Sequence, residues 1–320
     1  MKKVKNISIG LLIFSIVALC FIFDRPLVSE ASSDDENSRP YIQLKNITTD
    51  PETIYSDSYQ KNIYQQIEKV KQANDYTVDN PLLFENPYGT NTTSIYMYFT
   101  TDYDCMATYT INCQGYEDFT QTLNTNSLSG LSQEHEYLLV GAIPGAKNNI
   151  TVVLKDVNGK PITQISWSYQ APELLGGDQY LNASSESYDT TSPLTNGLYT
   201  VLGNDVTEEN NELAYMRLYD NEGIIISEIP IISYRSHRVL FKDNTMYFSV
   251  SSTKIVGMEQ TGYVSTIYST GDYKLHHDYI FDSQNNLIVL ASKKNAKTSE
   301  DKIIMIDHDT KAVTDRKSVV

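Results

Sequence analysis

The C-terminal half of the chain carries a repeat of about forty residues built from short strand-like segments. The triplets Ser236-His237-Arg238 and His276-His277-Asp278 each lead into a strand, a turn and a second strand. Phe241 and Phe281 occupy the same place in the two copies, forty residues apart. A strand-rich repeat of this length is typical of the blades of a β-propeller. Because equivalent positions in successive blades surround a common axis, we expect both polar triplets to face one channel mouth.

Further strand candidates continue through this half of the chain, separated by turn residues. We predict strands at 196–202, 213–219, 224–231, 239–241, 246–251, 262–268, 279–281, 287–291 and 302–306. Residues 263–268 and 303–307 give a second match at a distance of forty residues. The span from 196 to 320 has room for about three blades, whereas closed propellers have four to eight. We therefore expect an incomplete propeller, either a truncated copy or one part of an assembly such as a homodimer.

The first 24 residues have the pattern of an export signal. Lysines at positions 2, 3 and 5 precede an apolar run from 9 to 23, and acidic and basic residues follow it. Small residues at 29–31 would suit cleavage, but the run is also long enough for an uncleaved membrane anchor. Both alternatives place the remaining chain outside the cytoplasm, secreted or anchored at the bacterial cell envelope.

Between this signal and the repeat we predict a tether, one helix and a β-sandwich. Residues 25–57 are polar and resemble an exposed tether. Apolar residues at helical spacing indicate one amphipathic helix within 58–79. Alternating segments at 94–99, 107–111, 136–140, 150–154 and 162–169 predict a β-sandwich over 80–170, with a hairpin turn at 156–159. A linker over 171–195 leads to the incomplete propeller at 196–320, so the predicted fold class is all-β.

The composition excludes several classes of function. The formal net charge is −15 and no basic stripe is present, which argues against binding of nucleic acid. An anionic substrate would therefore need a local cationic pocket. Cys105 and Cys113 could pair in an oxidising compartment, but neither a disulfide framework nor a metal site is indicated by their spacing. Glycine-rich phosphate loops and serine hydrolase motifs are absent, and we expect no cofactor.

Several separated segments resemble the bacterial aryl-sulfate sulfotransferases. Residues 86–99 and 135–145 resemble the N-terminal domain of that family, and residues 218–223, 234–238 and 275–282 resemble its first propeller blades. The resemblance covers roughly residues 60–310. It implies an exported and often dimeric enzyme that moves a sulfuryl group from a phenolic sulfate ester to a phenol. The reaction passes through a sulfated histidine and needs no nucleotide sulfate donor.

The resemblance also implies which residues contact the substrate. His277, with His276 beside it, looks like the early-propeller histidine that contacts the sulfuryl group in the family. Asp278 is a candidate for fixing the tautomer of an imidazole. Arg235 and His237 are further candidates for substrate binding, although a basic cluster at such a place is more often solvated or paired with carboxylates. For both neighbouring histidines the structural alternative is that they cap a blade through backbone hydrogen bonds.

The remaining histidines have simpler interpretations. We expect His135 at the surface, in a loop before a strand, and His308 in a turn formed by residues 307–310. The nucleophilic histidine of the family belongs to a later blade and has no match here, and residues 315–320 depart from the blade pattern. We therefore expect half of a catalytic pocket and no activity from this chain alone. The alternative hypothesis is a non-catalytic, exported, β-rich binding module.

Overall fold

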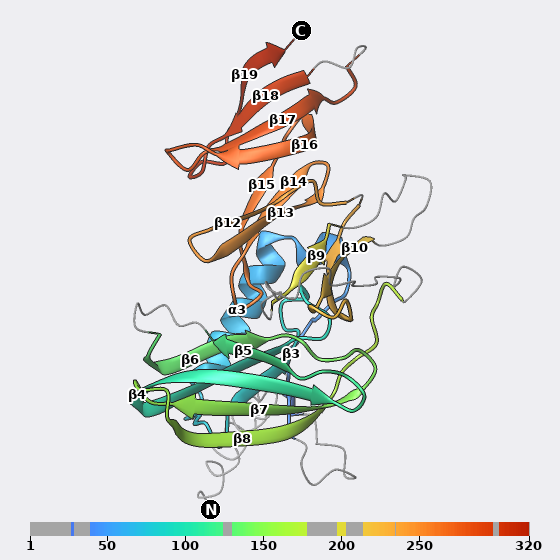
Figure 1. Cartoon of the computed structure of the whole chain (residues 1–320). Coiled ribbons are helices and arrows are strands. Elements are labelled where there is room, and N and C mark those ends of the chain that lie inside the picture. The colour runs from blue at the N-terminus through green and yellow to red at the C-terminus, as the bar shows by residue number, and fades with distance from the viewer. Residues whose placement is uncertain are drawn as a thin grey trace, which may run out of the picture.

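The computed structural model describes residues 27–28, 39–123, 130–177, 197–202, 214–233, 235–296 and 301–319. The fold of these residues is nearly all β, as predicted, with two short helices (Figure 1). The predicted export signal, the candidate cleavage site at 29–31 and most of the polar linker lie outside the described residues. Among the residues that are described, none of the helices has the length and apolar character needed to span a membrane.

The amphipathic helix predicted from the apolar spacing is α3 (Asp57–Lys71). The side chain of Ser56 caps its first turn by accepting a hydrogen bond from the backbone N–H of Tyr59, 3.3 Å away. Ile63 and Ile67 are almost fully buried on one face of the helix. This face packs on the β structure that follows, which offsets the poor stability of an isolated helix of this length.

The end of the expected tether is folded, which the sequence did not indicate. A short helix, α2 (Pro51–Ile54), buries Ile54 and the following Tyr55 completely. The hydroxyl of Tyr55 donates a 2.5 Å hydrogen bond to the carbonyl of Pro230, in a strand 175 residues later. Two large side chains in an otherwise polar segment are therefore part of the core. Two further short strands, β1 (Leu27–Val28) and β2 (Ile42–Gln43), pair with each other ahead of α2.

The sandwich is built around one long strand. Its strands are β3 (Leu82–Glu85), β4 (Ile95–Cys113), β5 (Phe119–Leu123), β6 (Ser132–Leu139), β7 (Lys147–Lys155) and β8 (Pro161–Gln170). The first part of β4 pairs with β3 and β6, and its last part pairs with β5 and β7. The two strands predicted at 94–99 and 107–111 are therefore one, because β4 continues through a register shift between Thr100 and Cys105.

The position of the cysteines on β4 explains why they do not pair. Cys105 and Cys113 are buried free thiols on the same extended strand. Eight residues of a strand at about 3.3 Å each separate them by far more than the reach of a disulfide. The hairpin turn predicted at 156–159 is present, with Gly159 at a φ of 76° and its N–H bonded to the carbonyl of Asp156.

Three antiparallel sheets follow the sandwich. The first consists of β9 (Tyr199–Val201), β10 (Ala214–Tyr219) and β11 (Ile225–Ile231), in the order β11-β10-β9. The second contains β12 (Val239–Lys242), β13 (Thr245–Ser251), β14 (Lys254–Met258) and β15 (Val264–Ser269). The third contains β16 (Tyr273–Phe281), β17 (Leu287–Lys293), β18 (Asp301–Ile306) and β19 (Val313–Val319). Both four-stranded sheets are meanders, and Figure 1 shows the three sheets following one another away from the sandwich.

The positions of the strands show which of the two sequence matches joins equivalent strands of different sheets. Phe241 and Phe281 both lie on the first strand of a four-stranded sheet, so this match is structural. The match of 263–268 with 303–307 was misleading, because the former lies on the fourth strand of its sheet and the latter on the third. In these sheets, strands β14 and β19 were not predicted, and residues 315–319, which were expected to depart from the blade pattern, belong to β19.

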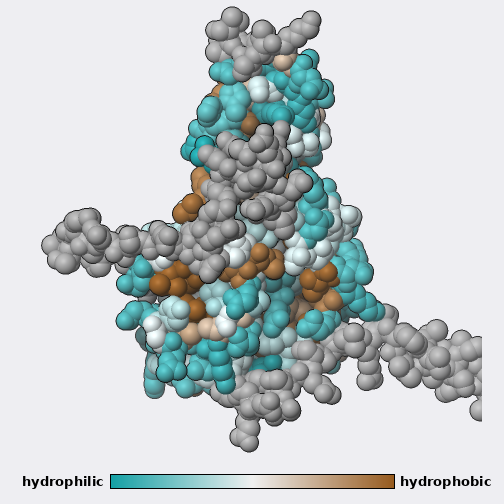
Figure 2. Space-filling view, turned by 90° about the vertical axis from the view of Figure 1, so that its right-hand side faces the viewer, coloured by the Kyte–Doolittle hydropathy of each residue, from teal (hydrophilic) through white to brown (hydrophobic). Residues whose placement is uncertain are grey.

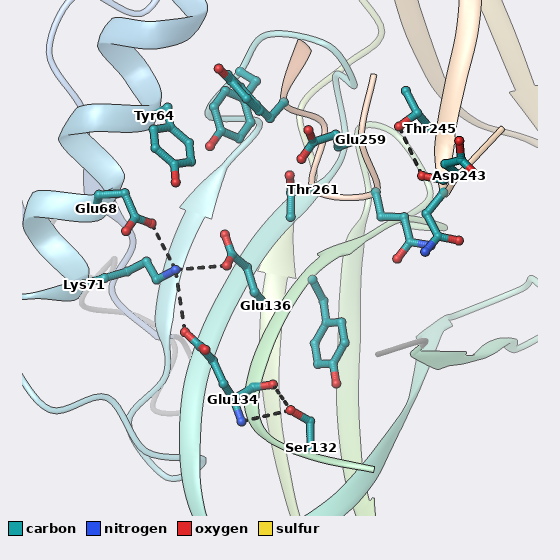
Figure 3. A pocket seen from close by; sticks show the side chains of 15 residues that line it. Tyr64, Glu68, Lys71, Ser132, Glu134, Glu136, Asp243, Thr245, Glu259 and Thr261 are labelled. Atoms are coloured by element: carbon teal, nitrogen blue, oxygen red, sulfur yellow. Dashed lines mark hydrogen bonds and ion pairs between the residues drawn. The ribbon is translucent and has the colours of Figure 1, made fainter. Parts of the chain in front are cut away.

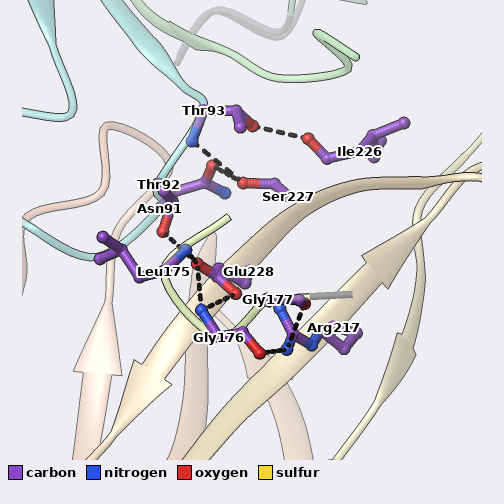
Figure 4. A network of polar contacts seen from close by, with 10 residues as sticks. All are labelled: Asn91, Thr92, Thr93, Leu175, Gly176, Gly177, Arg217, Ile226, Ser227 and Glu228. Atoms are coloured by element: carbon purple, nitrogen blue, oxygen red, sulfur yellow. Dashed lines mark hydrogen bonds and ion pairs between the residues drawn. The ribbon is translucent and has the colours of Figure 1, made fainter. Parts of the chain in front are cut away.

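A buried polar network joins the sandwich to the first sheet (Figure 4). In the loop between β3 and β4, Thr92 donates its backbone N–H to the carbonyl of Glu228, 3.1 Å away. The hydroxyl of Thr93 donates a 2.6 Å hydrogen bond to the carbonyl of Ile226. Ser227 completes the contact by donating to the side-chain oxygen of Asn91, 2.5 Å away. The loop is therefore held against β11 by one backbone hydrogen bond and several side-chain hydrogen bonds.

Glu228 is the centre of this network. Its carboxylate is fully buried, pairs with Arg217 of β10, and accepts hydrogen bonds from the backbone N–H groups of Leu175 and Gly176. Arg217 in turn donates to the carbonyl of Gly176, 2.9 Å away. Burial raises the pKa of Glu228, and the nearby Arg217 opposes this shift. The pair fixes the segment that leaves the sandwich against the first sheet.

Candidate functional site

A pocket of about 440 Å³ brings the repeated triplets together. We call it the histidine pocket, and it is lined by Val201, Leu202, Arg235, Ser236, His237, His276 and His277. Each of the three sheets contributes to it: the end of β9, the segment before β12 and the middle of β16. The backbone N–H of Ser236 donates to the carbonyl of Leu202, 2.7 Å away, and ties the first two contributions together.

A bulge in β16 removes His276 and His277 from the regular pairing of β16 with β17. Leu275 pairs with Ala291 and Tyr279 pairs with Val289, so β16 contains extra residues between two closely spaced partners. His277 has a φ of 71°, in the left-handed region that residues other than glycine seldom adopt. Bulges and such strained residues often occur beside functional sites because they redirect side chains. The two imidazole rings lie edge to face, with centroids 5.0 Å apart.

His237 is held in the pocket by the neighbouring strand β13. Its backbone N–H donates a 2.9 Å hydrogen bond to the hydroxyl of Ser249, and its ring Nδ1 lies 3.3 Å from the same oxygen. Burial lowers the pKa of His237 to about 4, and electrostatic interactions with Arg235, His277 and His276 lower it further. The imidazole of His237 is therefore neutral at pH 7.

The carboxylates near the pocket are arranged differently from the sequence-based expectation. Asp278 does not contact an imidazole but pairs with Arg238, at 2.7 and 2.9 Å. These two residues occupy equivalent positions in the repeat, so their ion pair links the second sheet to the third. The carboxylate beside an imidazole is that of Asp301, whose Oδ1 lies 3.2 Å from Nε2 of His276. Sequence reasoning missed Asp301 because it lies on another strand, β18, with no motif around it.

The charges that line the histidine pocket contrast with those of the whole protein. The chain has a formal net charge of −15. Among the described residues that line this pocket there are one arginine, three histidines and no carboxylate. Arg235 is exposed and Ser236 is almost fully buried. A pocket of this kind favours an anion, because imidazole N–H groups and a guanidinium donate hydrogen bonds to negatively charged oxygens.

The two other histidines lie outside the pocket. His135 was expected at the surface but is fully buried, stacked on Phe99 and in contact with Cys105 and the hydroxyl of Tyr137. The reason is that residues 132–139 form strand β6, and alternation turns His135 into the sandwich. His308 does lie in a turn as predicted, with its Nδ1 2.7 Å from the hydroxyl of Tyr268. In the described part of the chain, no group of three or more suitable side chains could hold a metal ion.

Comparison with known proteins assigns the two halves of the chain. The family profile described as arylsulfotransferase (ASST) matches residues 184–319, and the profile described as arylsulfotransferase Ig-like domain matches residues 82–172. No curated protein matches the chain. A crystal structure of a protein of unknown function from Bacteroides caccae is similar over 67% of this chain and 73% of its own, at 9% identity. Its TM-score of 0.24 is too low to support an argument. The two profiles match in order and cover the sandwich and the three sheets, and the chain belongs to the arylsulfotransferase family.

Proposed function

We propose that the histidine pocket binds the sulfuryl group of a phenolic sulfate ester and takes part in its transfer to a phenol. The observation that carries this proposal is a pocket with three histidines, an arginine and no carboxylate in a strongly acidic protein. A sulfuryl group spreads negative charge over its oxygens, and this charge changes as the ester bond breaks. Hydrogen-bond donors placed around those oxygens would stabilise the transition state. Membership of the arylsulfotransferase family supports the class of substrate.

In the proposed reaction the nucleophile is the imidazole of a histidine that lies outside the histidine pocket of this chain and faces it. The lone pair of a neutral ring nitrogen forms a bond to sulfur while the bond between sulfur and the ester oxygen breaks. The phenolate leaves with that electron pair, and the sulfuryl group stays on the histidine. A phenol oxygen then attacks the sulfur, the nitrogen–sulfur bond breaks, and the phenol proton passes to a base. These two steps predict ping-pong kinetics.

The geometry suggests different roles for the pocket residues. His277 projects from the bulge and makes no hydrogen bond or ion pair within the described residues, so we assign it the direct contact with the sulfuryl group. Asp301 orients His276 through its Nε2. Arg235, at the exposed side, would attract the anionic donor. His237 is neutral at pH 7 and supplies a further ring nitrogen without added charge.

We further propose that this chain supplies one side of a catalytic site and that additional blades complete it. The chain has five histidines, and His135 and His308 lie outside the pocket. No residue here corresponds to the nucleophile that the family carries in a later blade. The three sheets would be successive propeller blades, and the nucleophilic histidine would come from further blades packed beside them. The N-terminal signal would place this assembly outside the cytoplasm.

Binding and turnover of an aryl sulfate test this proposal together. Calorimetric titration of the purified chain with 4-nitrophenyl sulfate should show binding, and release of nitrophenolate in the presence of phenol should stay at the background rate. His277→Ala and Arg235→Ala should weaken binding, whereas the control His308→Ala should not. Unchanged binding by both pocket variants would disprove the assignment of the pocket. Rapid turnover by the chain alone would disprove the incomplete site.

A second candidate function is a non-catalytic binding module. Figure 2 shows a mainly hydrophilic surface whose hydrophobic patches gather around the middle of the molecule. In addition, Phe241 on β12, at the edge of its sheet, is 79% exposed. An exposed edge strand with a large apolar side chain is suited to pairing with another chain. Light scattering after size-exclusion chromatography separates the cases, because a stable monomer would argue against assembly through this edge.

A further inference from the structure

A second pocket, with a volume of about 590 Å³, lies where α3, the sandwich and the second sheet meet. Figure 3 shows Glu68 and Lys71 projecting from α3 toward Glu136 of β6, with Glu259 on the facing turn between β14 and β15. We call it the acidic pocket. It shares no lining residue with the histidine pocket, and nothing in the proposed sulfuryl transfer uses it.

The acidic pocket has far more negative than positive charge. Five carboxylates line it, those of Glu68, Glu134, Glu136, Asp243 and Glu259, against one lining lysine, Lys71, while Lys242 beside the pocket pairs with Asp243 at 2.8 Å. The Nζ of Lys71 lies 2.9 Å from Glu136, 3.0 Å from Glu68 and 4.0 Å from Glu134, so one cation is shared by three anions. Glu259 makes no side-chain hydrogen bond or ion pair within the described residues. The pocket therefore favours an additional positive charge.

Tyrosines form the apolar part of the same pocket. The ring of Tyr263 lies 5.1 Å from that of Tyr64 and 5.3 Å from that of Tyr88, measured between centroids. Tyr64 is 41% exposed, so part of its ring remains open to a ligand. The faces of such rings carry negative electrostatic potential and attract organic cations. Aromatic rings and carboxylates thus favour the same kind of ligand.

A nearly buried tyrosine whose hydroxyl opens on the pocket is a second observation that favours a ligand. Tyr88 is only 2% exposed and lines the acidic pocket. Its hydroxyl has no hydrogen-bond partner among the described residues, and it is not one of the fully enclosed polar atoms that lack one, so it reaches the open space of the pocket. A bound molecule with a polar group in the pocket would supply the missing partner. Burial raises the pKa of Tyr88, with a smaller contribution from Glu136, so the hydroxyl stays protonated.

These observations favour an organic cation over the other classes of ligand. The carboxylates of the pocket would repel an anion. A neutral apolar ligand would displace water from these carboxylates without replacing its hydrogen bonds, which is unfavourable. Among the described residues, the acidic side chains do not converge in a way that could hold a metal ion. We propose that the acidic pocket binds a small organic ammonium cation, with its charged nitrogen between the carboxylates and the tyrosine rings. The volume is within the range of small-molecule sites.

Calorimetry with matched cationic and neutral probes tests the proposal on the full chain. Phenethylammonium chloride should bind, and 2-phenylethanol, which has nearly the same shape without the charge, should bind at least about tenfold more weakly. High salt should weaken the binding of the cation, because part of the attraction is between exposed charges. Equal affinity for the two probes would overturn the proposal. So would heat from calcium chloride with none from phenethylammonium.

Two substitutions at the open side of the pocket locate the binding. Glu259→Gln removes an unpaired carboxylate and Tyr64→Leu removes an aromatic face, and each should weaken phenethylammonium binding by about threefold or more. Both side chains are partly exposed, so these variants are expected to fold. Glu222→Gln, an exposed carboxylate in the turn between β10 and β11, is the matched control and should bind normally. Wild-type affinity in both pocket variants would overturn the assignment.

Discussion

At the scale of single residues, the histidines show how the same side chain takes different roles in different surroundings. His135 is enclosed in the sandwich, whereas His276 and His277 face a pocket. The sequence identified the pocket pair because it occurs at a repeated position. The burial of His135 was not predicted, because the predicted strand begins at Glu136 and leaves His135 in a loop, whereas β6 begins at Ser132. Asp301 was missed because its contact with His276 depends on the pairing of β16, β17 and β18.

The buried His135 should make stability depend on pH. Burial lowers the pKa of His135 from 6.5 to about 4 in the folded chain. Below pH 6.5 the unfolded chain takes up a proton that the folded chain binds only near pH 4, so stability falls as the pH decreases through this window. The full effect is about 3 kcal/mol. Urea unfolding measured from pH 7 to pH 4 should show this fall.

The contribution of His135 can be separated from that of the carboxylates. His135→Gln keeps a polar side chain but does not titrate, so its stability should change less between pH 7 and pH 4 than that of the wild type. His308→Gln, at a half-buried turn, is the control and should retain the wild-type dependence. If all three proteins lose the same stability over this pH range, the proposed shift at His135 is wrong.

At the scale of secondary-structure elements, local patterns predicted the strands better than their partners. The alternation of apolar and polar residues located most strands of the sandwich and of the three sheets. It divided β4 into two, because the exposed bend around residues 101–104 interrupts the buried positions. It missed β14 because Lys254–Met258 is short, nearly all buried and contains Gly257, which lies against Tyr247. Pairing between elements distant in the chain, as at Glu228, left no pattern in the sequence.

Removing one partner of the buried ion pair between Arg217 of β10 and Glu228 of β11 should destabilise the junction between the sandwich and the first sheet. Arg217→Met leaves the carboxylate of Glu228 buried without its cation, at an expected cost of about 3–5 kcal/mol. Arg217→Met combined with Glu228→Gln should recover part of this loss, because the uncompensated charge is gone. Urea denaturation measures both free energies. A cost below about 1 kcal/mol for Arg217→Met would mean that this pair does not hold the first sheet on the sandwich.

At the scale of the whole molecule, two pockets of opposite character lie in different parts of one continuous fold. The hydrophobic core of the sandwich continues into β10–β15, and a second cluster joins the second and third sheets. This packing positions the histidine pocket between three sheets and the acidic pocket at the junction with α3. The repeat in the sequence indicated the first pocket. The second was not foreseen, because its side chains come from segments far apart in the chain.

The proposed contact between the histidine pocket and a sulfuryl group can be observed directly at the histidines. The most direct measurement follows the imidazole signals of all five histidines by nuclear magnetic resonance during titration with an aryl sulfate. If the pocket binds the sulfuryl group, the signals of His237, His276 and His277 should shift together and saturate, while those of His135 and His308 should not move. Shifts confined to His135 or His308, or no shift at millimolar aryl sulfate, would contradict the proposed contact.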